Sequence, residues 1–135
     1  MSIEVRNISY TYSSGTPFET KALKNISFEI KNGEFVGIMG HTGCGKSTLI
    51  QAIAGLISIS DGSIVIDGND INDKRYDRAE LRRKLGLVFQ YPEHQLFETT
   101  ILKDVCFGPK NQGLSEAEAI VRAVQVSSCH AAGGP

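Results

Sequence analysis

The 135-residue chain lacks several features that would mark a specialised class of protein. Its 14 basic residues nearly balance its 15 acidic ones, and a formal charge of -1 gives no support to a nucleic-acid partner. No apolar run is long enough to span a bilayer, and the N-terminus lacks the basic and apolar regions of a signal peptide. These absences favour a single cytosolic domain, unless a partner carries it to a membrane.

Cysteine and histidine are also scarce, with three of each. The cysteines are odd in number and far apart, which indicates free thiols in a reducing compartment. Neither residue type forms a cluster with metal-ligand spacing, so a metal site built from protein ligands alone is not expected. The residues concerned are Cys44, Cys106, Cys129, His41, His94 and His130.

Alternating apolar and polar residues predict an antiparallel start to the fold. Residues 3–12 alternate with a phase slip near Arg6, which indicates a bulged strand. Residues 13–20 have the composition of a loop. Residues 26–30 alternate again and precede an Asn-Gly pair that favours a hairpin turn. The N-terminal part is therefore predicted to be an antiparallel β subdomain.

The rest of the sequence predicts an α/β core. Continuous apolar runs at 35–39 and 85–89 are typical of strands buried on both faces of a parallel sheet. A shorter strand is expected at 64–66, between two Asp-Gly turns. Helices are expected at 47–54 with a closing Gly55, at 76–84, at 101–107, and from a capping box at Ser115 and Glu118 onward.

The C-terminal residues 127–135 show no period and are interpreted as a disordered or non-native tail. The folded part is accordingly predicted to be residues 1–126.

A glycine-rich motif separates the run at 35–39 from the helix that follows it. It reads GHTGCGKS and matches the phosphate-loop pattern G-x-x-x-x-G-K-[ST]. Glycines let the backbone N–H groups curl closely around an anion, and the helix N-terminus adds positive potential. We therefore predict a nucleoside triphosphate site at Gly40, His41, Thr42, Gly43, Cys44, Gly45, Lys46, Ser47 and Thr48.

Three polar side chains in this motif have distinct expected tasks. Lys46 places a mobile positive charge on the β- and γ-phosphates. The Ser47 hydroxyl is a hard oxygen ligand for Mg²⁺, and the Thr48 hydroxyl reaches the α-phosphate. The expected cofactors are therefore a nucleoside triphosphate and Mg²⁺.

Several segments outside the motif carry a family resemblance. These are "SSGTPFETKAL", "GHTGCGKST" and above all "VFQYPEHQLFETTILKDVCFGPKNQGLSE". From about Ile3 to Val126 the chain closely resembles the nucleotide-binding domain of ABC transporters, and most of all the ATPase subunit of energy-coupling factor transporters. The resemblance implies an α/β phosphate-loop core with parallel strands, an antiparallel N-terminal subdomain, and an incomplete ABC ATPase domain.

The resemblance also assigns roles beyond the motif. Tyr12 matches the aromatic residue that stacks on adenine, although a tyrosine at a strand end in a small core is the alternative. Gln90 matches the glutamine that approaches Mg²⁺ and the attacking water, and with Lys46 it is the expected catalytic pair. A docking segment for the transmembrane subunit, or else a locally buried turn, is expected at Glu93, His94, Gln95, Leu96 and Phe97.

The family pattern is incomplete in this chain. No LSGGQ-type signature, no apolar strand ending Asp-Glu and no switch histidine is present. The resemblance implies an ATPase subunit that powers import of a vitamin or transition-metal ion, peripheral on the cytoplasmic side of the plasma membrane. It would pair with a second ATP-binding subunit, identical or not. This chain alone is expected to bind ATP without hydrolysing it. The alternative is a soluble ABC ATPase of DNA repair or translation.

Overall fold

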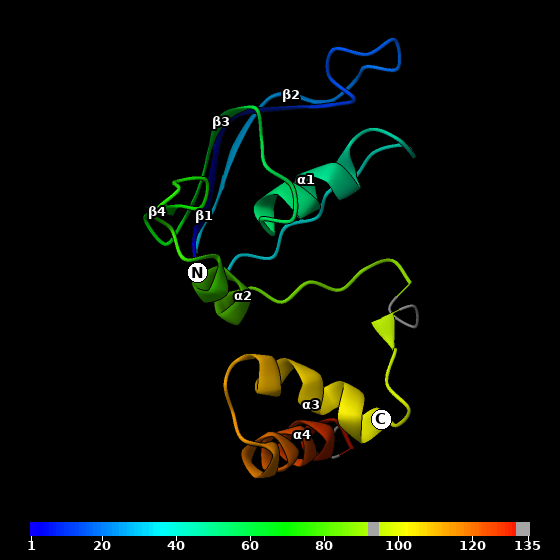
Figure 1. Ribbon diagram of the computed structural model, residues 1–135. Coiled ribbons are helices and arrows are strands. Elements are labelled where there is room, and N and C mark those ends of the chain that lie inside the picture. Colours follow the sequence, from blue (N-terminus) through cyan, green and yellow to red (C-terminus); the bar gives the residue numbers. More distant parts are fainter. Residues whose placement is uncertain (92–94, 132–135) are drawn as a thin grey trace. The chain divides into compact units, whose positions relative to one another are not determined.

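The computed structural model describes residues 1–91 and 95–131, and it divides into two compact units, Met1–Gly86 and Leu87–Pro135. The first unit combines a sheet with two helices, and the second is a pair of helices (Figure 1). No helix in the described part of the chain is both long and apolar enough to cross a membrane. The elements are β1 (Ile3–Tyr12), β2 (Thr20–Ile30), α1 (Lys46–Ile53), β3 (Asp61–Ile66), β4 (Asn69–Asp70), α2 (Arg78–Lys84), α3 (Ile101–Asn111) and α4 (Glu116–Ala131).

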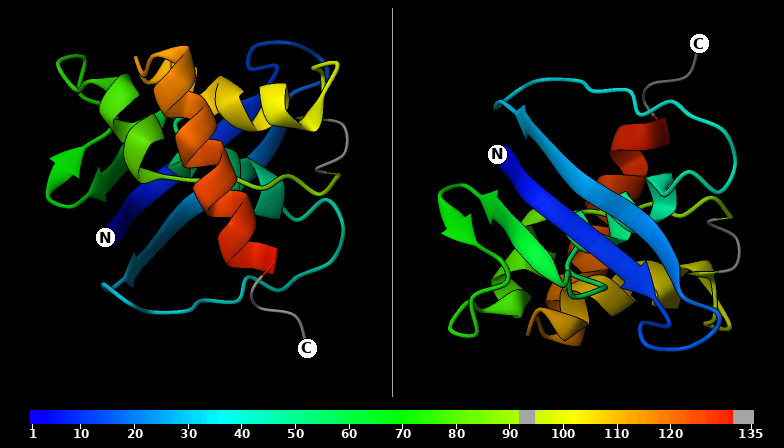
Figure 2. Two further views of the ribbon diagram at one scale, coloured as in Figure 1. Left: turned by 90° about the horizontal axis from the view of Figure 1, so that it is seen from below. Right: turned by 90° about the horizontal axis from the view of Figure 1, so that it is seen from above.

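The sheet is antiparallel, as the N-terminal pattern predicts. Its strand order is β2-β1-β3-β4, so β1 lies between β2 and β3 (Figure 2, right). Ile3 pairs with Ile30 on one side and with Ile66 on the other. The register shifts between Val5 and Ile8, and Asn7 has a φ of 49°. The predicted bulge in this strand is confirmed.

The β3 strand begins earlier than predicted, because Asp61 and Gly62 belong to it rather than to a turn. Gly62 has a φ of 86°, and a Cβ there would lie 2.3 Å from the carbonyl oxygen of Arg6. Glycine is therefore the residue that lets β3 approach the bulge in β1 so closely. The second Asp-Gly pair does form a turn, with φ values of 47° at Asp67 and 82° at Gly68.

Helix α1 packs against the sheet through its apolar face. A Schellman motif closes the helix: Leu56 N–H donates to Gln51 O at 2.9 Å, and Gly55 N–H donates to Ala52 O at 3.0 Å. This confirms Gly55 as the helix stop. The core of the first unit consists of Val5, Ile8, Leu23, Leu49, Ala52, Ile53, Ile64, Ile66, Ile71 and Leu81.

The two apolar runs are not strands in the structure, so their prediction as strands is wrong. Residues 35–39 and 85–89 carry no strand pairing in the described chain. Phe35 is 100% exposed and Met39 is 94% exposed. A strand needs a hydrogen-bonded neighbour, and no described strand pairs with either run. Apolar composition alone does not supply that neighbour.

Helices α2 and α3 begin at side-chain caps. Asp77 Oδ1 accepts the N–H of Ala79 at 2.8 Å at the start of α2, so this helix begins later than the predicted residue 76. The Thr100 hydroxyl accepts the N–H of Lys103 at 3.4 Å at the start of α3. This helix continues beyond the predicted residue 107, through Pro109 to Asn111.

The capping box of α4 is confirmed, because Glu118 accepts the N–H of Ser115 at 3.0 Å and its own N–H reaches the Ser115 hydroxyl at 3.4 Å. The helix continues to Ala131, so residues 127–131 of the predicted tail are helical, and residues 132–135 lie outside the described residues. Whether the domain boundary lies at residue 126 stays a prediction. Cys106 on α3 packs against Ala119 and Ala123 on α4 to form the core of the second unit.

Candidate nucleotide-binding site

The phosphate loop, residues 40–48, turns sharply at two glycines. Gly43 and Gly45 have φ values of 83° and 92°, a region that side-chain-bearing residues rarely occupy. Gly45 also packs against β2, because a Cβ at this position would lie 2.5 Å from the carbonyl oxygen of Ala22. The loop is thereby held against the sheet at its last turn before α1.

The start of α1 is suited to an anion. Gly45 caps the helix without a side-chain hydrogen bond, and its first turn contains no acidic residue. The N–H groups of this first turn thus carry no side-chain cap, and no carboxylate neutralises the positive end of the helix dipole. Ser47 is exposed at this end. The residues present fit a polyphosphate with its metal ion.

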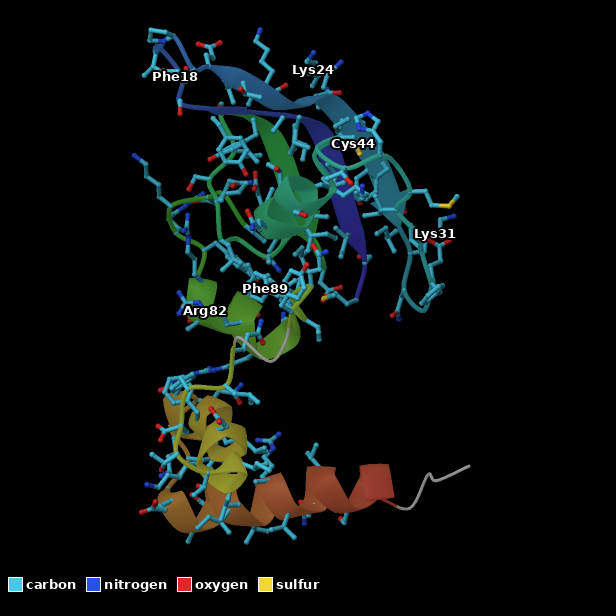
Figure 3. The ribbon with its side chains drawn as sticks, turned by 90° about the vertical axis from the view of Figure 1, so that its right-hand side faces the viewer. Phe18, Lys24, Lys31, Cys44, Arg82 and Phe89 are labelled. Carbon is cyan, nitrogen blue, oxygen red and sulfur yellow. The ribbon has the colours of Figure 1, made fainter. Side chains whose placement is uncertain are left out.

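Lys46 folds over the loop that precedes it. Its ammonium donates to the carbonyl oxygens of Gly40 at 2.7 Å and His41 at 2.8 Å, and it lies 3.7 Å from Cys44 Sγ. Figure 3 shows Cys44 on this loop, whereas Lys31 directly follows the last residue of β2. These ammonium contacts therefore hold the positive charge of Lys46 at the phosphate loop.

Two predicted nucleotide-binding residues are in direct contact. The Tyr12 hydroxyl at the end of β1 lies 3.1 Å from the Thr48 hydroxyl in the first turn of α1. Tyr12 is 40% exposed as a residue, and its ring packs edge-on against Tyr10, with centroids 4.9 Å apart. The structure therefore brings Tyr12, a partly exposed residue, to the phosphate loop.

Gln90 belongs to the second unit, where it is exposed at a bend. Its role beside Mg²⁺ and water stays a prediction. Of the predicted docking segment, Glu93 and His94 lie outside the described residues. The remaining residues are exposed, with Leu96 at 64% and Phe97 at 63%. The alternative of a locally buried turn is therefore wrong for this described part.

Asp104 on α3 holds the end of this segment, and the sequence reasoning missed it. Its carboxylate accepts the N–H groups of Phe97 at 3.3 Å and Glu98 at 3.2 Å. The Phe97 ring also packs edge-on against Phe107, with centroids 4.7 Å apart. The available signal was an acidic residue one turn after the Thr100 cap, where a carboxylate faces backbone N–H groups.

An ion pair in the first unit lowers the pKa of a carboxyl outside the loop. The guanidinium of Arg75 pairs with Asp73 at 2.9 Å and lowers the pKa of that carboxyl from 3.8 to about 2, with help from the Arg75 backbone N–H. This exposed pair belongs to the turn before α2, where Asp73 accepts the Arg75 N–H at 2.9 Å. It stabilises this turn, which lies outside the phosphate loop.

The fold and this loop together define a phosphate-loop nucleotide-binding domain. The family model "ABC transporter" matches residues 23–132, which is most of the chain. The chain therefore belongs to the ABC transporter family, as part of its ATPase domain. This family binds ATP, normally with Mg²⁺, and the match confirms the fold class predicted from the sequence.

Two known relatives are similar to most of the chain. It is 57% identical over 122 residues to the energy-coupling factor transporter ATP-binding protein EcfA2 of Clostridium acetobutylicum, covering 90% of this chain and 43% of that protein. It is 58% identical over 118 residues to EcfA2 of Caldanaerobacter subterraneus, covering 87% and 41% respectively. The chain thus spans less than half the length of these relatives.

Two solved structures are also similar to the chain. The chain is similar to cbiO1 from Clostridium perfringens, part of the ABC transporter complex cbiONQ, with a TM-score of 0.71 and 41% identity over 89% of this chain and 46% of that one. It is also similar to the dimeric ATP-binding cassette MJ0796 bound to ADP and Pi, with a TM-score of 0.75 and 33% identity over 91% and 54%.

Proposed function

We propose that this chain forms the nucleotide-holding part of the ATPase subunit of an energy-coupling factor importer for a vitamin or a transition-metal ion. The observation that carries the proposal is the phosphate loop, where the start of α1 has no side-chain cap and the Lys46 ammonium donates to the Gly40 carbonyl oxygen. The resemblance to EcfA2 proteins supports the type of transporter. No comparable observation favours a soluble ATPase of DNA repair or translation.

In this proposal the loop backbone and Lys46 hold the β- and γ-phosphates of ATP, and the ring of Tyr12 stacks on adenine. Ser47 supplies one ligand to Mg²⁺, and Gln90 supplies a second contact near the attacking water. Mg²⁺ held there would supply further positive charge to the γ-phosphoryl group. Lys46 adds positive charge beside it without forming a covalent bond.

The proposal includes two protein partners. The exposed apolar side chains of Leu96 and Phe97 suit a groove on the transmembrane subunit, with the whole of residues 93–97 forming the docking segment. A second ATP-binding subunit, identical or related, completes the assembly, which lies peripherally on the cytoplasmic side of the plasma membrane. The balanced charge gives no support to a nucleic-acid partner.

This chain alone binds ATP without turning it over. Its sequence has no acidic residue at the end of an apolar strand to act as general base, and no signature motif to complete a site across a dimer. Phosphate release by the purified chain should therefore equal the background rate. Steady release that disappears in Lys46→Ala would contradict this part of the proposal.

Calorimetric titration of Mg–ATP tests nucleotide binding itself. Losing one charge-assisted hydrogen bond costs about 1.5–3 kcal/mol, so Lys46→Ala should weaken affinity roughly ten- to a hundredfold. Lys31→Ala is the matched control, since it removes an exposed lysine at the end of β2 (Figure 3) and should leave affinity unchanged. Equal affinities for wild type and Lys46→Ala would overturn the assignment of the loop.

A further inference from the structure

The contact between Tyr12 and Thr48 joins two groups that were assigned to different parts of the nucleotide. Tyr12 was predicted from its aromatic ring to bind the base, and Thr48 from its hydroxyl to bind the α-phosphate. Their hydroxyl oxygens lie 3.1 Å apart, across 36 residues of sequence. A stacking role for Tyr12 requires only the ring and does not explain this hydroxyl contact.

Both ends of the contact are held in place by the fold. Tyr12 pairs with Thr20 in the β1–β2 ladder, and its ring packs edge-on against Tyr10 at an interplanar angle of 87°. Thr48 is buried, with 7% of its surface exposed, in the first turn of α1. The phenol and the threonine hydroxyl therefore meet from two rigid elements rather than by a chance swing of exposed side chains.

The direction of this hydrogen bond decides what Thr48 offers to a ligand. If Thr48 donates to Tyr12, its remaining groups toward the loop are lone pairs, which repel a phosphate oxygen. If Tyr12 donates to Thr48 Oγ1, the threonine proton is free to be donated to that anion. Two hydrogen bonds in series also polarise and strengthen each other. A phosphate in the loop thus favours the second arrangement.

We propose that the Tyr12 hydroxyl is a positioning group for the phosphate site, acting through Thr48 and independently of the base. A proton donor chain runs from the Tyr12 phenol to Thr48 Oγ1 and from the Thr48 hydroxyl to an α-phosphate oxygen. No bond to either proton is broken in this arrangement. The inference rests on the proposed function, because it requires a phosphate in the loop.

The test uses tripolyphosphate beside ATP and ADP, because tripolyphosphate has no base on which a ring could stack. Calorimetric titration of the full chain compares wild type with Tyr12→Phe, which removes the hydroxyl and keeps the ring. The expected result is the same loss of affinity, about three- to tenfold, for all three ligands. Tyr10→Phe is the matched control: it removes a hydroxyl from the neighbouring tyrosine and should change nothing.

A double-mutant cycle separates positioning from general stability. The loss caused by Tyr12→Phe should vanish in a Thr48→Val background, which keeps the shape of the side chain without its hydroxyl. Thr48→Ser restores a hydroxyl and should restore most of the dependence on Tyr12. Thermal unfolding of each ligand-free variant checks that the fold persists.

Several results would overturn the inference. Tyr12→Phe could leave tripolyphosphate affinity unchanged, or weaken only ATP and ADP, which would place the phenol at the base. Its effect could also persist undiminished with Thr48→Val, which would break the link through Thr48. If wild type binds neither tripolyphosphate nor ATP, the proposed function fails and this inference fails with it.

Discussion

Alanine substitutions at two glycines of the phosphate loop should separate backbone strain from steric contact. Gly43 and Gly45 have similar φ values, 83° and 92°. A Cβ at Gly43 would meet nothing within 4 Å, whereas one at Gly45 would lie 2.5 Å from the carbonyl oxygen of Ala22 and 3.3 Å from the Leu23 side chain. Gly43→Ala therefore adds strain alone, and Gly45→Ala adds strain and a clash.

The magnitudes follow from these two contributions. Placing a residue with a Cβ in the left-handed region costs about 1–2 kcal/mol, which is the expected loss of unfolding free energy for Gly43→Ala. Forcing extra volume into a packed region costs typically about 1–3 kcal/mol more, so the expected loss for Gly45→Ala is about 2–5 kcal/mol. The Ala22 carbonyl cannot easily move aside, because the next residue, Leu23, pairs with Tyr10 in the sheet.

Urea unfolding followed by circular dichroism measures both losses on the ligand-free chain. The midpoint of Gly45→Ala should fall well below that of Gly43→Ala, with similar slopes for the two variants. Gly40→Ala is the mildest control, since its φ is not positive and its Cβ would meet only the movable thiol of Cys44 at 2.6 Å. Equal midpoints for Gly43→Ala and Gly45→Ala would refute the close approach of the loop to β2.

Three further predictions concern single groups. Maleimide should label Cys44 and Mg–ATP should slow that labelling, since the thiol lies in the loop 3.7 Å from the Lys46 ammonium; a rate indifferent to Mg–ATP would argue against binding there. Asp104→Ala should speed amide exchange at Phe97, whose N–H it accepts at 3.3 Å; unchanged exchange would show that the contact is dispensable. Arg75→Ala should raise the pKa of Asp73 from about 2 toward 3.8. Because the folded pKa is the lower one, the pair stabilises the fold above pH 3.8 and loses this effect as the pH falls toward 2. If NMR titration gives the same pKa for the Asp73 carboxyl in wild type and in Arg75→Ala, this assignment is contradicted.

Local signals in the sequence predicted local structure well. The bulge near Arg6, the Gly55 helix stop and the Ser115 capping box each depend on residues a few positions apart, and all three are confirmed. The phosphate-loop motif belongs to the same class, because its turns are set by its own glycines. The family resemblance depended on such short motifs and is confirmed by the ABC transporter match.

Features that depend on distant parts of the chain were not predictable. The apolar runs at 35–39 and 85–89 predicted strands, but no described strand supplies the partner that either would need. The β2 strand begins at Thr20, whereas the prediction began it at residue 26. The prediction missed residues 20–25 because the strand is irregular at Asn25, which has a φ of 49°, and the alternation is broken there. The contact of Tyr12 with Thr48 depends on packing the end of β1 against α1, which no sequence period records.

The most direct test of the nucleotide site is an NMR titration of the isotope-labelled chain with Mg–ATP. The account predicts that the largest amide shifts fall within residues 40–48 and at Tyr12, and that Lys46→Ala needs roughly ten- to a hundredfold more ATP to produce them. The Asp73 turn, which lies outside the phosphate loop, should not shift. Largest shifts outside the loop and Tyr12, or identical titrations for wild type and Lys46→Ala, would contradict the assignment of this loop as the nucleotide site.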